Sequence, residues 1–194
     1  MRRLVLMALV LGLLAGCSAP ERPQFRSTDI TGADYAKDFA LNDPSGQVRH
    51  LGDFKGKVVT VFFGYTHCPD VCPTTLATMA EVVRQLGPEG DRVQVIFVTV
   101  DPERDTPELL KQYVPAFHPG FLGLSADLAT TAAVARDFKV FFKKQGDVAG
   151  GNYTVDHSAG TYVFDPQGRL RLYVKHGETA DVIAADIRQL LAGH

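Results

Sequence analysis

Two runs of apolar, β-branched and aromatic residues indicate the centre of the fold. Residues 57–63 (Lys-Val-Val-Thr-Val-Phe-Phe) and residues 93–100 carry few polar side chains and show no strict alternation. A strand that is covered on both faces of a sheet has this pattern. We therefore predict two central, fully buried strands at these positions.

Segments of helical and strand periodicity alternate along the rest of the chain. Helices are expected from about Pro73, after the Asp- and Pro-containing segment 101–107, and over residues 128–138 and 179–191. Short strands are expected at 39–41, 48–50, 121–124, 161–164 and 170–174. The turn-forming clusters 42–46 and 165–168 join two pairs of these strands as hairpins, and the glycine-rich stretch 146–152 is expected to be a loop.

The order of these elements is βαβ, then a helix, then ββα, with cysteines directly after the first central strand. It predicts an α/β protein with a central mixed sheet flanked by helices and with an N-terminal β-hairpin. This layout resembles the thioredoxin fold.

Residues 1–17 have the layout of an export signal. Met-Arg-Arg is followed by an apolar run from Leu4 to Leu14, which is shorter than the about 20 residues of a membrane-spanning helix. The ending Leu-Ala-Gly-Cys resembles a bacterial lipobox, in which the Cys is acylated. We predict a lipoprotein signal peptide over residues 1–16 and a lipid anchor at Cys17, on the extracytoplasmic, periplasmic side of a bacterial membrane. A plain signal peptide or an uncleaved anchor would place the protein on the same side.

The mature chain divides into a tether and one domain. Residues 17–28 are polar, contain Pro20 and Pro23 and show no apolar period, so we expect a lipid-anchored tether. Residues 29–194 have the length of a single domain, which we expect to be monomeric. The formal charge of −2 becomes about −4 when Arg2 and Arg3 are lost with the signal. Without a basic run, such a chain is not suited to nucleic acid.

Two of the three cysteines lie in the expected domain, four positions apart, in Cys68-Pro69-Asp70-Val71-Cys72. A disulfide that closes so small a loop stabilises a fold little, which argues against a structural bridge. A helix N-terminus favours the thiolate form, which serves either a redox pair or two ligands for a soft metal. The common redox motif has two intervening residues rather than three, so the spacing favours the metal.

A metal site of this kind needs a third ligand, and neutral imidazole is compatible with thiolates. Of the six histidines, His157 directly precedes the expected strand 161–164, where a thioredoxin-like chain returns beside the cysteine helix. His67 adjoins Cys68, but neighbouring side chains on an extended chain usually point apart. The others are expected in polar turns or in solvent: His50, His118, His176 and His194.

Three segments resemble the SCO/SenC family of copper-binding assembly factors: Phe62–Pro73 (Phe-Phe-Gly-Tyr-Thr-His-Cys-Pro-Asp-Val-Cys-Pro), Val100–Pro107 and Asp156–Ala159. The likeness covers about residues 30–192. It implies a thioredoxin-like metallochaperone that delivers copper to, or prepares the thiols of, the binuclear copper centre of cytochrome c oxidase. It also implies one copper bound by Cys68, Cys72 and His157. The implied partners are a copper-accepting oxidase subunit or another copper chaperone.

Two thiolates and one imidazole suit Cu(I), whereas Cu(II) prefers a further oxygen or nitrogen ligand. Three aspartates could supply that further ligand or could form hydrogen bonds to the metal ligands: Asp70, Asp101 and Asp105. Their ordinary roles would be a helix cap for Asp70 and turn formation for the other two. A structural zinc site would need a fourth protein ligand.

Two other functions stay open. A thiol–disulfide oxidoreductase would use Cys68 as nucleophile and Cys72 as resolving thiol, with a reversible disulfide between them. Such an enzyme has no need of His157, which is why the sequence favours a non-enzymatic metallochaperone. A redox or copper sensor without a delivery role is the third interpretation.

Overall fold

The structure, a computed structural model, describes residues 24–194. The expected signal peptide, the anchor Cys17 and the first part of the expected tether lie outside the described residues. Within residues 24–194, no helix has the length and apolar character needed to cross a membrane.

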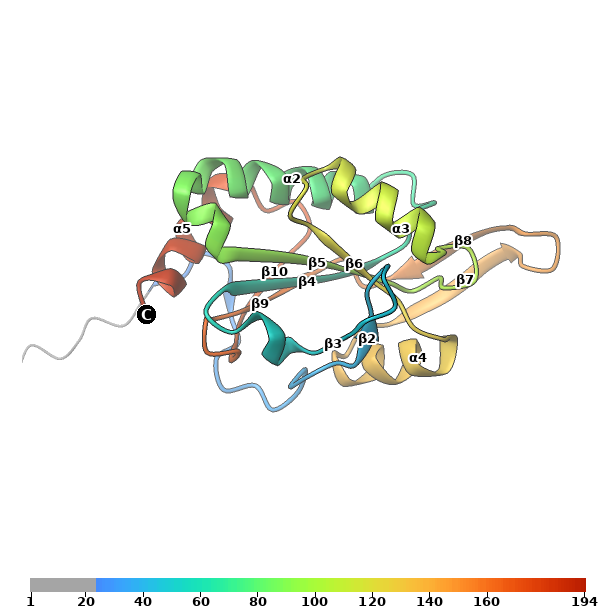
Figure 1. The fold of residues 1–194 in the computed structure, drawn as a ribbon, viewed down its shortest axis with the longest axis horizontal. Helices are drawn as coiled ribbons and strands as arrows, with labels where there is room; N and C mark the ends of the chain where they lie inside the picture. Colours follow the sequence, from blue (N-terminus) through green and yellow to red (C-terminus); the bar gives the residue numbers. More distant parts are fainter. Residues whose placement is uncertain (1–23) are drawn as a thin grey trace, which may run out of the picture.

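A six-stranded mixed sheet forms the centre of the domain (Figure 1). Its strands stand in the order β1 (Thr28–Asp29), β10 (Leu170–Val174), β9 (Thr161–Phe164), β4 (Val58–Gly64), β5 (Val93–Thr99) and β6 (Leu122–Leu124). Strands β4, β5 and β6 run parallel, whereas β9 and β4, β10 and β9, and β1 and β10 pair antiparallel. All of β4 is buried and β5 is almost entirely so, as the two apolar runs predict.

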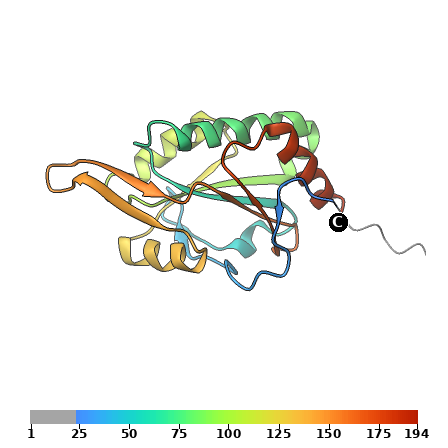
Figure 2. The same cartoon turned by 180° about the vertical axis from the view of Figure 1, so that it is seen from behind.

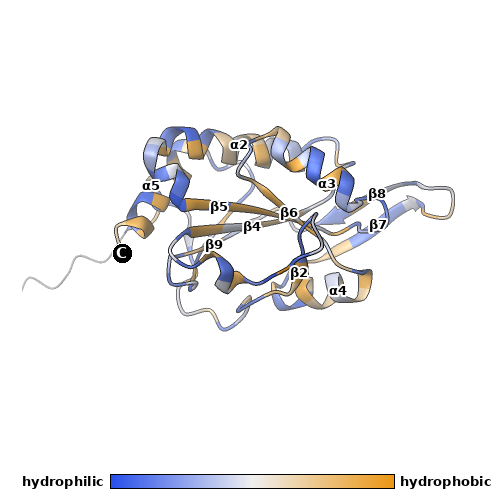
Figure 3. Cartoon of the chain, viewed as in Figure 1, coloured by the Kyte–Doolittle hydropathy of each residue, from blue (hydrophilic) through white to orange (hydrophobic). Residues whose placement is uncertain are grey.

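Helices cover both faces of this sheet (Figures 1 and 2). One face carries α2 (Val71–Leu86), α3 (Pro107–Tyr113) and α5 (Ala180–Leu191), and the other carries α4 (Leu128–Asp137). Short 3-10 helices are η2 (Leu51–Phe54), η3 (Gly87–Arg92) and η4 (Val114–Ala116). The central strands are the most apolar elements (Figure 3), and the large side chains between the layers are fully buried, among them Phe62, Phe97, Phe138, Leu76 and Ile187.

The N-terminal hairpin is present as β2 (Leu41–Asn42) and β3 (Val48–Arg49). The architecture is therefore the predicted one: α/β, with a central mixed sheet flanked by helices and an N-terminal hairpin.

A second hairpin departs from the prediction. Strands β7 (Phe142–Asp147) and β8 (Asn152–His157) form a separate two-stranded sheet that projects from the body (Figures 1 and 2). The prediction of a loop over residues 146–152 is wrong at both ends, because Gly146 pairs with Tyr153 and Asn152 pairs with Asp147 between the two strands. Only residues 148–151 connect the two strands.

The chain joins the fold a little before residue 29. Thr28 pairs with Tyr173 of β10, and the backbone N–H groups of Arg26 and Ser27 donate to the carboxylate of Asp186 in α5 at 2.9 and 2.8 Å. Asp186 is buried, so these bonds hold the start of the domain firmly. The last residues of the expected tether are therefore part of the folded unit.

Candidate metal centre

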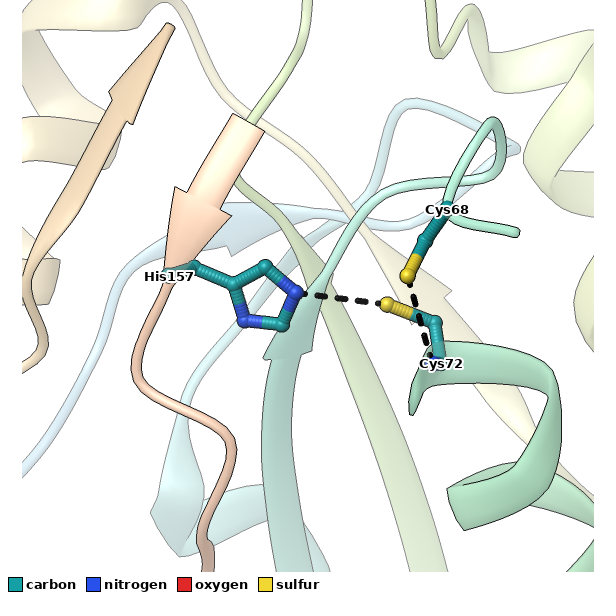
Figure 4. A group of neighbouring side chains, drawn as sticks. All are labelled: Cys68, Cys72 and His157. Atoms are coloured by element: carbon teal, nitrogen blue, oxygen red, sulfur yellow. Dashed lines mark hydrogen bonds between the residues drawn. The ribbon is translucent and has the colours of Figure 1, made fainter. Parts of the chain in front are cut away.

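Three side chains of metal-ligand type, from two distant parts of the chain, converge at one end of β4 (Figure 4). Cys68 lies in the loop after β4, Cys72 in the first turn of α2, and His157 at the end of β8. Their sulfur and nitrogen atoms all lie within 4.8 Å of one another. Among the described residues, this is the one group of three or more His, Cys, Asp or Glu side chains that is close enough to share a metal ion.

Cys72 is at the centre of the group. Its Sγ lies 3.4 Å from His157 Nε2, and its backbone N–H donates to Cys68 Sγ at 3.5 Å. The Cys72 side chain is fully buried, whereas Cys68 and His157 are partly exposed. An ion or a partner protein therefore reaches the group past Cys68 and His157.

Gly64, at the end of β4, makes room for the buried sulfur. A Cβ atom at this position would lie 2.8 Å from Cys72 Sγ and 2.8 Å from the Phe97 ring, closer than real Cβ contacts. The absence of a side chain at Gly64 thus lets the first turn of α2 pack directly against the sheet.

The imidazole of His157 is oriented by its neighbour in the chain. Its Nδ1 lies 3.0 Å from the carbonyl oxygen of Ser158, and since a carbonyl can only accept, Nδ1 is the protonated nitrogen. Nε2 then keeps its lone pair and points toward Cys72. The rings of Phe62 and Tyr65 lie edge-on to the imidazole, with centroids 6.0 and 5.9 Å away. Burial lowers the pKa of His157, which favours the neutral form that binds metals.

Burial acts on Cys72 against the effect expected at a helix N-terminus. The helix dipole favours a thiolate, but loss of hydration around the buried sulfur outweighs it and raises the pKa of Cys72. The backbone N–H of Tyr65, directed at the sulfur, lowers the Cys72 pKa but offsets only part of this effect. In the metal-free protein Cys72 is a protonated thiol at neutral pH, and a metal that binds there displaces the proton.

The three candidate aspartates do not belong to the group of ligand atoms. Asp70 is exposed at the N-cap of α2, where its carboxylate makes no capping bond and accepts a hydrogen bond from the Thr74 hydroxyl at 3.4 Å. Asp101 and Asp105 are fully buried and bonded to other side chains. Burial raises the pKa of Asp105.

His67 is also outside the group. Its side chain is 52% exposed, and its Nδ1 lies 3.0 Å from the Thr66 hydroxyl.

Sequence reasoning gave no role to Tyr153 or Arg104, which the structure places beside Asp101. The sequence signal for a strand at this position is the alternation of apolar Tyr153 and Val155 with polar Thr154, and the structure buries the two apolar residues and exposes the polar one.

Comparison with known proteins settles the family. The sequence model of SCO1/SenC matches residues 27–192, most of the chain. The chain belongs to the SCO1/SenC family. An SCO2-like protein of Rickettsia felis is 36% identical over 181 residues, which are 89% of this chain and 87% of that protein. The mitochondrial SCO2 homolog of Bos taurus is 40% identical over 157 residues, but the chain spans only 59% of its length.

Solved SCO structures share the fold. The structure of Bradyrhizobium japonicum ScoI with copper bound is 42% identical and superposes with a TM-score of 0.72, over 79% of this chain and 97% of that one. The SCO1/SenC assignment confirms the resemblance seen in the sequence, and the structural match confirms the predicted thioredoxin-like fold.

Proposed function

We propose that this SCO1/SenC protein binds one copper ion through Cys68, Cys72 and His157, and that it is a copper metallochaperone for the binuclear centre of cytochrome c oxidase. The observation that carries the proposal is the convergence of two thiols and a neutral imidazole within 4.8 Å. Relatives named as copper-bound SCO proteins support the choice of metal.

The donor set fits copper better than its common competitors. Thiolate and imidazole are ligands of Cu(I), and a three-ligand set lacks the fourth protein ligand of a structural zinc site. Copper of either oxidation state is accommodated if a water or a recipient's side chain supplies further ligands for Cu(II). The ion is cargo in this proposal.

Exposure suggests the order in which the ligands act. Cys72 is buried and holds the ion from inside, while Cys68 and His157 are partly exposed, so a recipient's thiol or imidazole meets them first. Replacement of ligands one at a time lets the ion pass without being released to water.

We also propose that the protein is exported and lipid-anchored through Cys17, because residues 14–17 resemble a lipobox. Cells that express the protein should incorporate labelled palmitate into it, and Cys17→Ala should abolish the label. Labelling that persists in the variant would contradict this anchor.

Delivery can be separated from thiol chemistry with a purified recipient. We expect the copper-loaded protein to transfer its ion to the metal-free, reduced copper-binding domain of the oxidase subunit. Because a binuclear centre takes two ions, two donor proteins are supplied for each recipient, and the measurement is the copper content of donor and recipient after they are separated. Copper that stays on the donor would contradict the chaperone role.

A thiol–disulfide oxidoreductase is the second candidate, favoured by the unequal exposure of the two thiols. The partly exposed Cys68 has the place of an attacking thiol and the buried Cys72 that of a resolving one. In a parallel experiment with the oxidised, disulfide-containing recipient, the metal-free, reduced protein would then reduce the recipient's disulfide, its own two thiols supplying two electrons and two protons. We expect this reaction to proceed equally well with His157→Ala, because no imidazole is needed for it.

A further inference from the structure

Within residues 24–194, the strand that carries His157 does not pair with any strand of the main sheet. In the described structure, β8 pairs only with β7, and the hairpin extends beyond the body of the domain (Figures 1 and 2). The two cysteines, by contrast, are attached to the central strand β4 and to α2. The short link 158–160 to β9 brings His157 to this end of the sheet, and side-chain contacts are then needed to hold the hairpin in a fixed position relative to the sulfurs.

One short turn, residues 101–105 after β5, contacts both halves of the site. On the cysteine side, the buried carboxylate of Asp105 accepts hydrogen bonds from the backbone N–H of Thr66 at 3.0 Å and from its hydroxyl at 2.5 Å. Thr66 is two residues before Cys68, so these bonds hold the loop that carries the cysteines.

On the histidine side, the buried carboxylate of Asp101 accepts a 2.9 Å hydrogen bond from the Tyr153 hydroxyl. Arg104 bonds to the other oxygen of Asp101 and donates to the carbonyl of Tyr153 at 2.9 Å, while its guanidinium carbon lies 3.6 Å from the centroid of the Tyr153 ring. Tyr153 and His157 are four residues apart on β8, on the same face of the strand. Holding Tyr153 therefore holds the part of β8 that presents His157 to the sulfurs, while the Ser158 carbonyl orients the ring itself.

Hydrogen bonds within residues 99–105 hold the turn together. The carbonyl of Asp101 accepts the backbone N–H groups of Arg104 and Asp105 at 3.1 and 2.9 Å. The Thr99 hydroxyl accepts from the N–H of Asp101 at 2.9 Å and donates to Asp105 at 2.6 Å. These bonds join the two carboxylates within one hydrogen-bonded turn.

We propose that residues 101–105 form a brace that sets the distance between His157 and the two sulfurs, with Tyr153, Arg104 and Asp101 as positioning residues for the imidazole. This inference rests on the proposed copper binding. When the hairpin is detached from Asp101, the imidazole spends less time beside the sulfurs and contributes less to copper affinity. The thiolates, held by Asp105 and α2, are unaffected.

The test is a double-mutant cycle between Tyr153 and His157 in the purified protein. Tyr153→Phe removes only the hydroxyl that bonds to Asp101. We expect it to weaken Cu(I) binding by up to about 10-fold, the lower end of the cost of losing a group that bonds a metal-bound histidine directly, because Tyr153 acts on His157 only through the strand. In the His157→Ala protein, the same change should leave Cu(I) affinity as it is. The measurement is competition for Cu(I) with a chromogenic chelator.

Two further variants make the test specific. Arg104→Lys keeps the positive charge but loses the guanidinium group that donates to both Asp101 and the Tyr153 carbonyl. It should also weaken Cu(I) binding, and this loss of affinity should disappear in the His157→Ala protein. Tyr162→Phe is the matched control, because it removes a buried hydroxyl that bonds to the carbonyl of Phe138, and copper affinity should not change. X-ray absorption of the copper-loaded Tyr153→Phe protein should show a weaker nitrogen contribution and unchanged sulfur.

Two results would overturn the brace: no loss of affinity in Tyr153→Phe, or an equal loss with and without His157, which would show a general effect on the fold. A wild-type protein that takes up no copper would instead overturn the proposed function, and the brace with it.

Discussion

Oxidation of Cys68 and Cys72 to a disulfide is expected to abolish copper binding. A thiolate is a strong ligand for copper and a disulfide sulfur is a very poor one, so the oxidised protein keeps only the imidazole. The two sulfurs are free and lie within 4.8 Å of each other, whereas a disulfide needs about 2.05 Å. The loop between β4 and α2 therefore has to move for the bond to form.

The experiment uses the metal-free domain, residues 25–194, in which these are the only cysteines. Diamide accepts the two electrons and two protons of the thiols, the bridge is confirmed by mass, and Cu(I) affinity is measured before and after reduction. The Cys68→Ser, Cys72→Ser double variant is the control, since oxidant should not alter its residual affinity. Equal affinity in the oxidised and reduced states of the wild-type domain would show that the sulfurs are not ligands.

Replacement of His157 by Ala should separate copper binding from thiol chemistry. The variant loses one ligand and keeps both sulfurs at the start of the same helix. We expect Cu(I) affinity to fall by about 100-fold or more, because loss of a ligand costs more than loss of a group that only hydrogen-bonds to a ligand. The reduction potential of the cysteine pair should stay within about 30 mV of the wild-type value.

Chelator competition gives the affinity, and equilibration with glutathione gives the potential. His50→Ala is the control, because His50 is an exposed histidine outside the ligand group that pairs with Asp38, and its loss should change neither quantity. If His157→Ala binds Cu(I) as tightly as the wild type, the imidazole is not a ligand and the brace has no function.

Local patterns were enough to predict the elements that build the cysteine half of the site. The continuous apolar run of β4 and the helical spacing after Pro73 place a loop and a helix start around Cys68 and Cys72. The position of His157 before β9 follows from the expected topology, because β9 pairs with β4 and so brings the preceding residues to the same end of the sheet.

Other properties of the site depend on contacts between residues distant in the sequence. Strand β7 is mostly polar and exposed, so no apolar pattern distinguishes it from a loop. The bond between Tyr153 and Asp101 joins residues 52 positions apart, and neither residue type indicates its partner. The raised pKa of Cys72 results from tertiary burial, which a helix-terminus argument does not include.

The copper content of the domain, residues 25–194, tests the central claim most directly. The reduced domain is loaded with excess Cu(I), desalted, and analysed for copper and protein. Because only one group of two cysteines and one histidine converges in the described structure, we predict one copper per chain, and almost none in Cys72→Ser. A wild-type domain that keeps no copper, or that keeps two ions, would contradict the single Cys68, Cys72 and His157 site.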